Sequence, residues 1–267
     1  MPGLVWALFW AQLAAQTVSS VLPAGSALPG TLAVVFLQAG FSVTHLASRR
    51  GFGAAGAYLA ATISICGGLE ALSVATGFPF GWYHYATGLG PAVLGVPLLV
   101  PLAWSMMAYP AWCVARAITP PGWRSVVVAA LALTAWDLFL DPRMTQLGLW
   151  VWEHPGPYAG VPISNFAGWL LTSLILFTVL AKVLNKRPAL APARFVWFDW
   201  LPVLAFAFTW VGTSAANLVL WRQPLPAVVS GIGMGLAAAP GLVALGRAWL
   251  AHAPSPWARS RAGSLRG

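Results

Sequence analysis

Eight apolar runs, each roughly as long as a helix that crosses the hydrocarbon core of a membrane, recur along this chain. The residues are 59% hydrophobic and only 7% charged, whereas a soluble domain carries about 25% charged residues. This pattern predicts an all-α fold, a polytopic membrane helix bundle of about eight transmembrane helices. The expected spans are Leu4–Leu22, Leu28–Ala47, Ala54–Thr76, Ala92–Ile118, Arg124–Leu140, Ile163–Leu184, Val196–Leu220 and Ala227–Leu250.

The loops between the runs are too short for a soluble domain, so residues 1–252 are expected to form a single transmembrane helical domain. Residues 253–267 are rich in Pro, Ser and Arg, which predicts a disordered, basic cytoplasmic tail that contacts anionic lipid. The fourth run contains Pro97, Pro101 and Pro110. We therefore expect the fourth helix to be kinked or broken.

The positive charges fall on one side of this arrangement. Lys and Arg collect in the cytoplasmic loops of membrane proteins, and only Arg143 and Arg222, of the fourteen such residues, fall on the opposite side. We therefore expect both termini to be cytoplasmic and the protein to lie in the inner (plasma) membrane, with the lipid bilayer as a partner. The same rule accounts for the net charge of +9, and we expect no nucleic-acid partner.

Carboxylates are costly in so apolar a chain, and two of the five acidic residues stand together. Asp137 and Asp141 are four residues apart at the end of the fifth run, so a helix places them on one face. Pro142 predicts that this helix ends at Asp141, because the residue before a proline avoids the α region. Two like charges this close cannot both ionise easily, so we expect the pair to share a proton. A carboxylic acid that stays neutral is what a proton donor requires.

A structural role for the two aspartates is the alternative. Asp141 would then cap the following loop or pair with Arg143, and Asp137 would bond to a neighbouring helix. An ionisable group within a span is functional by default, which favours the proton donor.

Other polar residues are expected at the same, non-cytoplasmic level. Glu70 ends the third run, and His84 lies in the loop that follows. Around the start of the sixth run come Arg143, Glu153, His154 and Asn165. Glu70, Glu153 and the two histidines are candidate catalytic bases, although histidines beside aromatic residues are also common interfacial anchors.

We expect no metal and no cofactor. The chain has no H-E-x-x-H, no Glu-x-x-His pair and no set of cysteine ligands. It also lacks the G-x-G-x-x-G pattern of dinucleotide-binding sites, and four histidines are too few for a multi-histidine di-iron oxygenase. Cys66 and Cys113 lie within apolar runs, where cysteine is usually a small core residue.

Aromatic residues surround the acids. Most of the sixteen tryptophans lie near span ends, where interfacial anchoring is their common role. Beside an acid, however, their π faces can stabilise a carbocation by up to about 2 kcal/mol each. Such a site suits the protonation of an olefin. The candidate substrate-binding residues are Trp82, Tyr83, Tyr85, Trp104, Trp136, Arg143, Trp152, Asn165 and Trp169.

A short pattern occurs twice. Gly95-Val96-Pro97 is followed seven residues later by Trp104, and Gly160-Val161-Pro162 is followed seven residues later by Trp169. Each copy stands before or at the start of a predicted span. The repeat could come from duplication of a two-helix unit. It could equally arise by chance, in two loops that face the same constraint.

Spans three to six also carry five recognisable segments, of which the D-x-x-x-D-P and G-V-P-x-x-N segments are the most specific. They are Gly77–Tyr85, Leu89–Pro91, Gly95–Pro97, Ala135–Arg143 and Gly160–Trp169. Together they resemble the integral-membrane carotenoid biosynthesis family, whose characterised members are carotenoid 1',2'-hydratases.

The resemblance implies that water is added across the terminal double bond of an acyclic carotenoid ψ-end. The implied substrate is γ-carotene, lycopene or a bacterioruberin precursor dissolved in the membrane, and other carotenoid-pathway enzymes are expected partners. A general acid would protonate the less substituted alkene carbon, and water would capture the resulting tertiary cation. No redox cofactor is implied.

Roles for individual residues follow from their positions. Asp137, the deeper acid, is expected to donate the proton, with Asp141 as its partner, held by Arg143. The candidates to position or deprotonate the water are Glu70, His84, Glu153 and His154.

Two other functions stay open. A different carotenoid end-group enzyme, such as a cyclase, would share the protonation step. A transporter or lipid-binding protein would be expected to carry ionisable groups near the membrane midplane, whereas the acids here gather at one end. Prenyl transfer needs Asp-rich Mg²⁺ sites, which this chain lacks.

Overall fold

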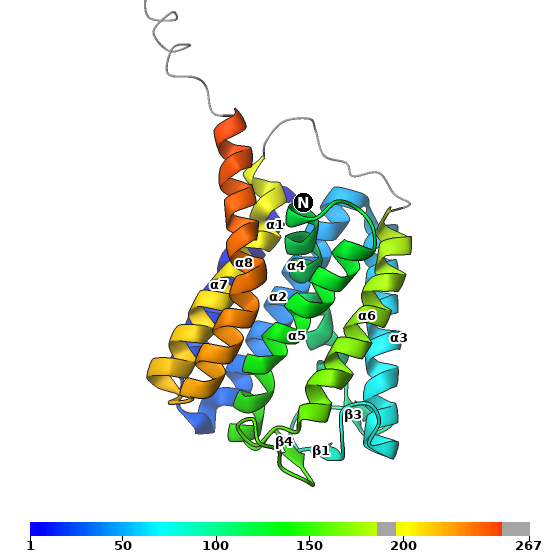
Figure 1. Cartoon of the computed structure of the whole chain (residues 1–267), viewed down its shortest axis with the longest axis vertical. Helices are drawn as coiled ribbons and strands as arrows, with labels where there is room; N and C mark the ends of the chain where they lie inside the picture. Colours follow the sequence, from blue (N-terminus) through cyan, green and yellow to red (C-terminus); the bar gives the residue numbers. More distant parts are fainter. Residues whose placement is uncertain (186–195, 253–267) are drawn as a thin grey trace, which may run out of the picture.

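A computed structural model describes residues 1–185 and 196–252 and shows an all-α membrane helix bundle (Figure 1). Within that part of the chain, seven helices are long and apolar enough to cross a membrane, and α4 is the eighth long helix. The predicted fold class is confirmed. The helices are α1 (Pro2–Val21), α2 (Ala27–Arg50), α3 (Phe52–Thr76), α4 (Leu99–Ile118), α5 (Trp123–Gln146), α6 (Ile163–Asn185), α7 (Trp197–Ala215) and α8 (Pro224–His252).

Short elements close one end of the bundle, drawn at the bottom of Figure 1. A 3-10 turn η1 (Ala24–Ser26) joins α1 to α2, and a π-helical segment η2 (Ala216–Leu220) ends α7. Two antiparallel pairs lie in the loops, β1 with β4 and β2 with β3. The strands are β1 (Tyr83–Tyr85), β2 (Ala92–Val93), β3 (Val96–Pro97) and β4 (Trp150–Trp152).

The basic side chains separate along the bundle as the sequence predicted. Arg49, Arg116, Arg124 and Lys182 belong to helix ends at the top of Figure 1, while Arg143 belongs to the end of α5 at the bottom. Which end faces the cytoplasm stays a prediction. The predicted tail, residues 253–267, lies outside the described residues.

The fourth helix starts later than the sequence predicted. The expected span began at Ala92, whereas α4 begins at Leu99. Residues 92–97 instead turn back on themselves, because Leu94 and Gly95 both adopt positive φ, 52° and 80°, a combination typical of a two-residue hairpin turn. From Leu99 the helix is continuous to Ile118 and packs against α2, α3, α5, α7 and α8.

The predicted end of the fifth helix at Asp141 is wrong. Helix α5 continues through Pro142 to Gln146. Proline has no N–H to bond to the carbonyl four residues earlier, which here belongs to Leu138. The Tyr158 hydroxyl donates to that carbonyl oxygen at 3.1 Å. A side chain from a later loop thus satisfies the group that the proline leaves without its backbone partner.

The same solution occurs at two other helix prolines. In α4, Pro110 frees the carbonyl of Met106, which accepts a hydrogen bond of 2.9 Å from the Ser42 hydroxyl. In α7, Pro202 frees the carbonyl of Phe198, which lies 2.8 Å from Nε2 of His45. Both supporting side chains belong to α2, so this helix satisfies backbone carbonyls that prolines free in two neighbours.

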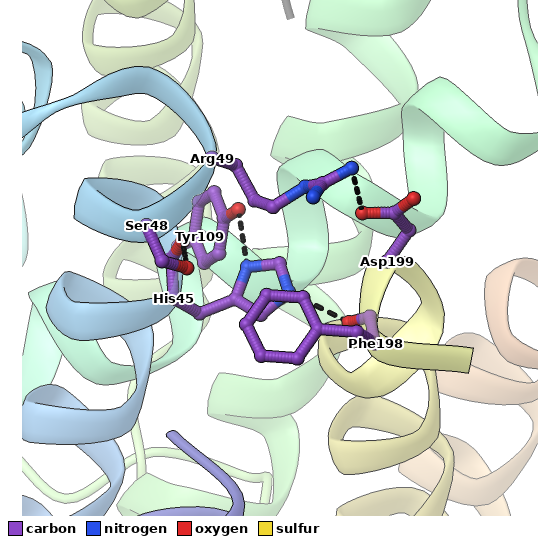
Figure 2. Close-up of polar contacts among 6 residues, drawn as sticks. All are labelled: His45, Ser48, Arg49, Tyr109, Phe198 and Asp199. Carbon is purple, nitrogen blue, oxygen red and sulfur yellow. Dashed lines mark hydrogen bonds and ion pairs between the residues drawn. The ribbon is translucent and has the colours of Figure 1, made fainter. Parts of the chain in front are cut away.

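His45 is the centre of a polar cluster at the end of the bundle away from the strands (Figure 2). Its Nε2 must donate to the Phe198 carbonyl, so in the neutral ring Nδ1 accepts from the Tyr109 hydroxyl at 2.8 Å. Nearby, Arg49 and Asp199 form a salt bridge of 2.5 Å between α2 and α7. The cluster joins α2, α4 and α7.

The two copies of the repeated pattern have the same local structure. Ala159 and Gly160 adopt positive φ of 50° and 86°, as Leu94 and Gly95 do, and each turn is followed by Val-Pro and a helix. The tryptophans seven residues later, Trp104 and Trp169, stack with their ring centroids 3.7 Å apart and planes within 14°. The echo in the sequence therefore corresponds to two matching hairpins that start α4 and α6.

Candidate functional site

A cavity of about 500 Å³ lies inside the bundle, and residues of the β1–β4 pair form part of its lining. Helices α1 to α7 and both strands of the β1–β4 pair contribute to its wall. Glu70, Asp141 and Asn165 line it, and so do most of the aromatic residues that the sequence singled out. An apolar cavity with a few convergent polar groups is the expected form of a small-molecule site.

Glu70 is surrounded by hydrogen-bond donors. It lies in the last two turns of α3 and is only 5% exposed. The hydroxyls of Tyr83 and Tyr85 both donate to Oε2, the latter at 2.7 Å, and the indole N–H of Trp104 donates to Oε1 at 3.0 Å. Because all three neighbours donate, they suit a carboxylate rather than a carboxylic acid.

Asp137 and Asp141 form a second acidic group, joined by Asn165. The amide nitrogen of Asn165, in the first turn of α6, donates to Oδ2 of Asp141 and to Oδ2 of Asp137, the second at 3.1 Å. Asp141 also accepts a bond of 3.0 Å from the Trp150 indole. Within the described chain, Oδ1 of Asp137 has no hydrogen-bond partner, although it is fully buried. The predicted closeness of the two carboxyls is present.

The two aspartates differ in their relation to the cavity. Asp141 lines it, whereas Asp137 is 0% exposed and stands behind the wall, one helical turn deeper. The prediction that Asp137 is the deeper acid therefore agrees with the structure, but the carboxyl that a ligand would meet is that of Asp141.

The β1–β4 pair contacts both acidic groups, through Tyr83 and Tyr85 to Glu70 and through Trp150 to Asp141. Tyr83 is opposite Trp152, and Tyr85 is opposite Trp150. Burial of these tyrosines, reinforced by the negative charge of Glu70, raises the pKa of both hydroxyls well above the ordinary value of 10. Both therefore stay protonated and continue to donate to Glu70.

An aromatic wall faces the acids. Trp169 stacks on Trp104, and the Trp136 ring meets Trp169 edge-on with 6.0 Å between centroids. All three are at most 5% exposed and line the cavity. Their buried rings provide an electron-rich surface, which is suited to a cationic or polyene ligand.

Four predicted site residues lie elsewhere. His84 alternates with Tyr83 and Tyr85 along β1 and is exposed, as the period-two geometry of a strand requires. Glu153 and His154 are also exposed, and Trp82 is 46% exposed. None of the four lines the cavity.

Arg143 lines the mouth of the cavity but does not hold Asp141 as predicted. Its guanidinium lies 4.3 Å from the ring centroid of Trp221 and donates to the Gln146 side chain at 2.8 Å. In the described residues the one salt bridge is Arg49–Asp199. The cation–π contact at Trp221 takes the place of the expected ion pair.

Several cavity residues were missed from the sequence. Trp150 was not among the candidate substrate-binding residues, yet its indole N–H donates to Asp141. Gln16, Gln38 and Thr209, from spans with no recognisable motif, also line the cavity. The glutamines could have been identified because burying an amide within an apolar run costs free energy unless it is hydrogen-bonded. The described residues contain no cluster of three or more His, Cys, Asp or Glu arranged to hold a metal ion.

Comparison with known proteins matches this chain to a family. A family model described as "Carotenoid biosynthesis protein" matches residues 30–237. A curated relative, bisanhydrobacterioruberin hydratase from Haloarcula japonica, is 32% identical over 155 residues, which cover 55% of this chain and 52% of the relative. The chain thus spans about half the length of that relative. No solved structure matches.

Proposed function

Because this chain belongs to the carotenoid biosynthesis protein family, we propose that it is a membrane hydratase that adds water to the terminal double bond of an acyclic carotenoid ψ-end. The observation that carries the proposal is the Asp137–Asp141–Asn165 group at the edge of an aromatic-walled cavity. The 32% identical relative, a hydratase of a carotenoid, supports the same reaction class.

The substrate end would enter the cavity from the membrane, with its terminal double bond beside Asp141. A polyene has no polar group to anchor it, so the aromatic rings of Trp104, Trp136 and Trp169 would hold it by apolar contact. The cavity volume of about 500 Å³ suits one end of a long chain, while the rest of the polyene lies among lipid.

The first chemical step is protonation. The carboxyl of Asp141 gives its proton to the less substituted alkene carbon, which forms a C–H bond and leaves a tertiary cation on the neighbouring carbon. Asp137 stands behind it and shares the negative charge that remains, through the Asn165 amide that both carboxyls bind. This division of labour reverses the roles expected from the sequence, because Asp141 is the acid on the cavity wall.

The second step is capture of the cation by water. The indole faces of the aromatic wall stabilise the cation until a C–O bond forms. Glu70, held as a carboxylate by Tyr83, Tyr85 and Trp104, accepts the proton that the attacking water loses. Return of that proton to the aspartate pair completes the cycle, and the net change is addition of one water.

Expression in a host that makes lycopene or γ-carotene, followed by mass analysis of the pigments, tests the proposal. A product heavier by one water is expected. An unchanged mass with a new ring would replace hydration by cyclisation, and an unchanged pigment profile would remove the proposed enzyme activity.

A further inference from the structure

The cavity has a second wall that differs chemically from the aromatic one. Helices α1, α2 and α7 contribute amide and hydroxyl side chains, which we call the polar lane. Its members on the cavity surface are Gln16, Ser20, Gln38, Thr209 and Thr213. The proposed acids and rings, all on other elements, do not use these groups.

The polar lane leads from the end of the bundle to its interior. Ser20 and Thr213 are partly exposed and lie near the ends of α1 and α7, beside the strand-bearing end in Figure 1. Further in, Thr209 is 4% exposed and Gln38 is 1% exposed. Residues Gln16 and Ser20 are one turn apart on α1, as are Thr209 and Thr213 on α7, so each helix presents one continuous polar edge.

The hydroxyl groups are set to accept hydrogen bonds from a ligand. Ser20 donates to the Gln16 carbonyl at 2.8 Å, and Thr213 donates to the Thr209 carbonyl at 2.5 Å. The Thr209 hydroxyl lies 3.0 Å from both the Ala205 carbonyl and Oε1 of Gln16, either of which can accept its proton. All three hydroxyl protons thus have acceptors in the protein, while the hydroxyl oxygens keep lone pairs that can accept.

The amide groups are set to donate. Gln38 gives its N–H to the sulfur of Met107 at 2.8 Å, and a thioether is a weak acceptor. Behind the lane, Gln12 is 0% exposed, and its Nε2 has no partner among the described residues. An amide buried without a good partner is costly in an apolar environment. Gln16 donates to Oε1 of Gln12 on its own helix and to Oε1 of Gln38 on α2. The Nε2 groups of Gln12 and Gln38 are therefore the donors without a good acceptor.

The lane ends next to the proposed site. Met107, which Gln38 contacts, is three residues from Trp104 on α4, about 4.5 Å along the helix axis. Trp104 in turn donates to Glu70. The polar lane thus offers both hydrogen-bond donors and acceptors, from its partly exposed end to the proposed site. Such a wall suits small molecules that both donate and accept hydrogen bonds.

We propose that the polar lane binds and delivers the water that the reaction consumes. The inference rests on the proposed hydration and adds its water route: the polyene meets the aromatic wall, and water reaches the cation along α1, α2 and α7. The separation allows an apolar cavity to stay occupied by substrate while its second reactant arrives from another side.

The experiment follows the fate of the cation. Membranes that contain the full chain are given lycopene in D₂O. Each protonation then places deuterium on the polyene end. A cation that captures water becomes deuterated alcohol, whereas a cation that loses a proton returns as alkene, part of which retains deuterium. The ratio of deuterated alkene to deuterated alcohol therefore measures how well water reaches the cation.

The variant is the double substitution Thr209→Val with Thr213→Val, which removes two water-binding hydroxyls at nearly constant volume. We expect the alkene-to-alcohol ratio to rise about tenfold, because capture slows while protonation continues. Thr44→Val is the matched control: Thr44 is also partly buried and bonds its own helix, to Gly40 at 2.7 Å, but it does not line the cavity. Its ratio should equal that of the wild type.

Three results would overturn the inference. If deuterated alkene and alcohol fall together, the lane positions substrate or supports the fold. If the ratio stays unchanged in the double variant, water arrives by another route. If the wild-type protein produces neither compound, the proposed hydration itself fails and the lane fails with it, so the two failures are distinguishable.

Hydroxyl-radical footprinting gives a readout that does not depend on turnover. Met107 and Met234 are both 0% exposed, but only Met107 contacts the lane. Radicals form from water, so Met107 should be oxidised several-fold faster than Met234 in the folded wild-type protein, and this excess should shrink in the double variant. Equal oxidation of the two methionines would refute a hydrated lane even where a variant fails to fold.

Discussion

Tyr85 and Trp150 face each other across the β1–β4 pair, with ring centroids 5.8 Å apart, and each donates a hydrogen bond to a different acid. Tyr85 bonds Glu70, and Trp150 bonds Asp141. Two carboxyls from helices that are far apart in sequence are thereby fixed relative to each other by one short strand pair. The β1–β4 pair therefore positions both the proposed acid and the proposed base.

The aspartate pair should be indispensable to activity. We expect Asp141→Asn to lower the hydration rate by about 10²- to 10⁴-fold, since it removes the donated proton. Asp137→Asn should lower it as well, because the remaining charge can no longer be shared. Asp199→Asn, which alters the salt bridge to Arg49 outside the cavity, is the control and should retain activity. The measurement is hydrated carotenoid per folded protein, and full activity in Asp137→Asn would remove that residue from the mechanism.

Glu70 should matter for its charge rather than its shape. Glu70→Gln keeps the side-chain volume, and the hydroxyls of Tyr83 and Tyr85 can rotate to accept from the new amide. We therefore expect a thermal midpoint near that of the wild type and a rate lower by about 10²-fold. Normal hydration by the variant would contradict the proposed base, and a much lower thermal midpoint would show that the fold itself needs the charge.

The two buried tyrosines should make stability fall in alkali. Their pKa values in the folded protein are raised above 10, whereas the unfolded chain ionises near 10. The stability that the neutral hydroxyls contribute is therefore fully present below pH 10 and is lost as pH rises above it. The thermal midpoint of the detergent-solubilised protein should therefore drop as the pH rises above about 10. The drop should be smaller with Tyr83→Phe and Tyr85→Phe combined.

The Tyr158 hydroxyl should stabilise α5 only because Pro142 leaves a carbonyl without its backbone partner. Tyr158→Phe should cost about 1 to 3 kcal/mol, the penalty for a buried acceptor without a donor. In a Pro142→Ala background the helix can bond its own Leu138 carbonyl, so the same change should cost less. Unfolding midpoints of the wild type, the two single variants and the double variant measure the coupling between Tyr158 and Pro142. Additive effects of the two substitutions would argue against this role.

Topology can be tested apart from chemistry. Reporter fusions at Thr87, in the loop after β1, and at Pro120, between α4 and α5, should report opposite sides of the membrane. The fusion at Pro120 is expected to be cytoplasmic. Both reporters on the same side would contradict the eight-helix arrangement.

The helices and the level of the acids could be predicted because both follow from the cost of exposing polar groups to hydrocarbon. Asp137, Asp141 and Glu70 could be identified as candidates because a carboxylate is costly to bury within an apolar span. His84 was misplaced for a simpler reason: it alternates with Tyr83 and Tyr85, and a three-residue strand was not recognisable within an aromatic loop.

Long-range contacts account for what could not be predicted. A proline within a helix usually ends or kinks it, whereas α5 continues through Pro142. The Tyr158 hydroxyl, sixteen residues later, donates to the carbonyl that this proline leaves without its backbone partner. Arg143 was assigned to the nearest acid in sequence, whereas Trp221 comes from the far end of the chain. The polar lane was missed because its amides and hydroxyls are scattered over three helices and converge only in the fold.

The prolines of α4 and α7 also bear on the order in which the chain is made. Ser42 and His45, on α2, supply hydrogen bonds to the carbonyls that Pro110 and Pro202 leave behind. Helix α2 is synthesised before α4 and α7, so the side chains that bond to these carbonyls are made before the prolines that free them. Helix α5 is the exception, since Tyr158 is translated after it. Translation order thus makes α2 a template for two later insertions and leaves α5 incomplete until the loop before α6 has emerged.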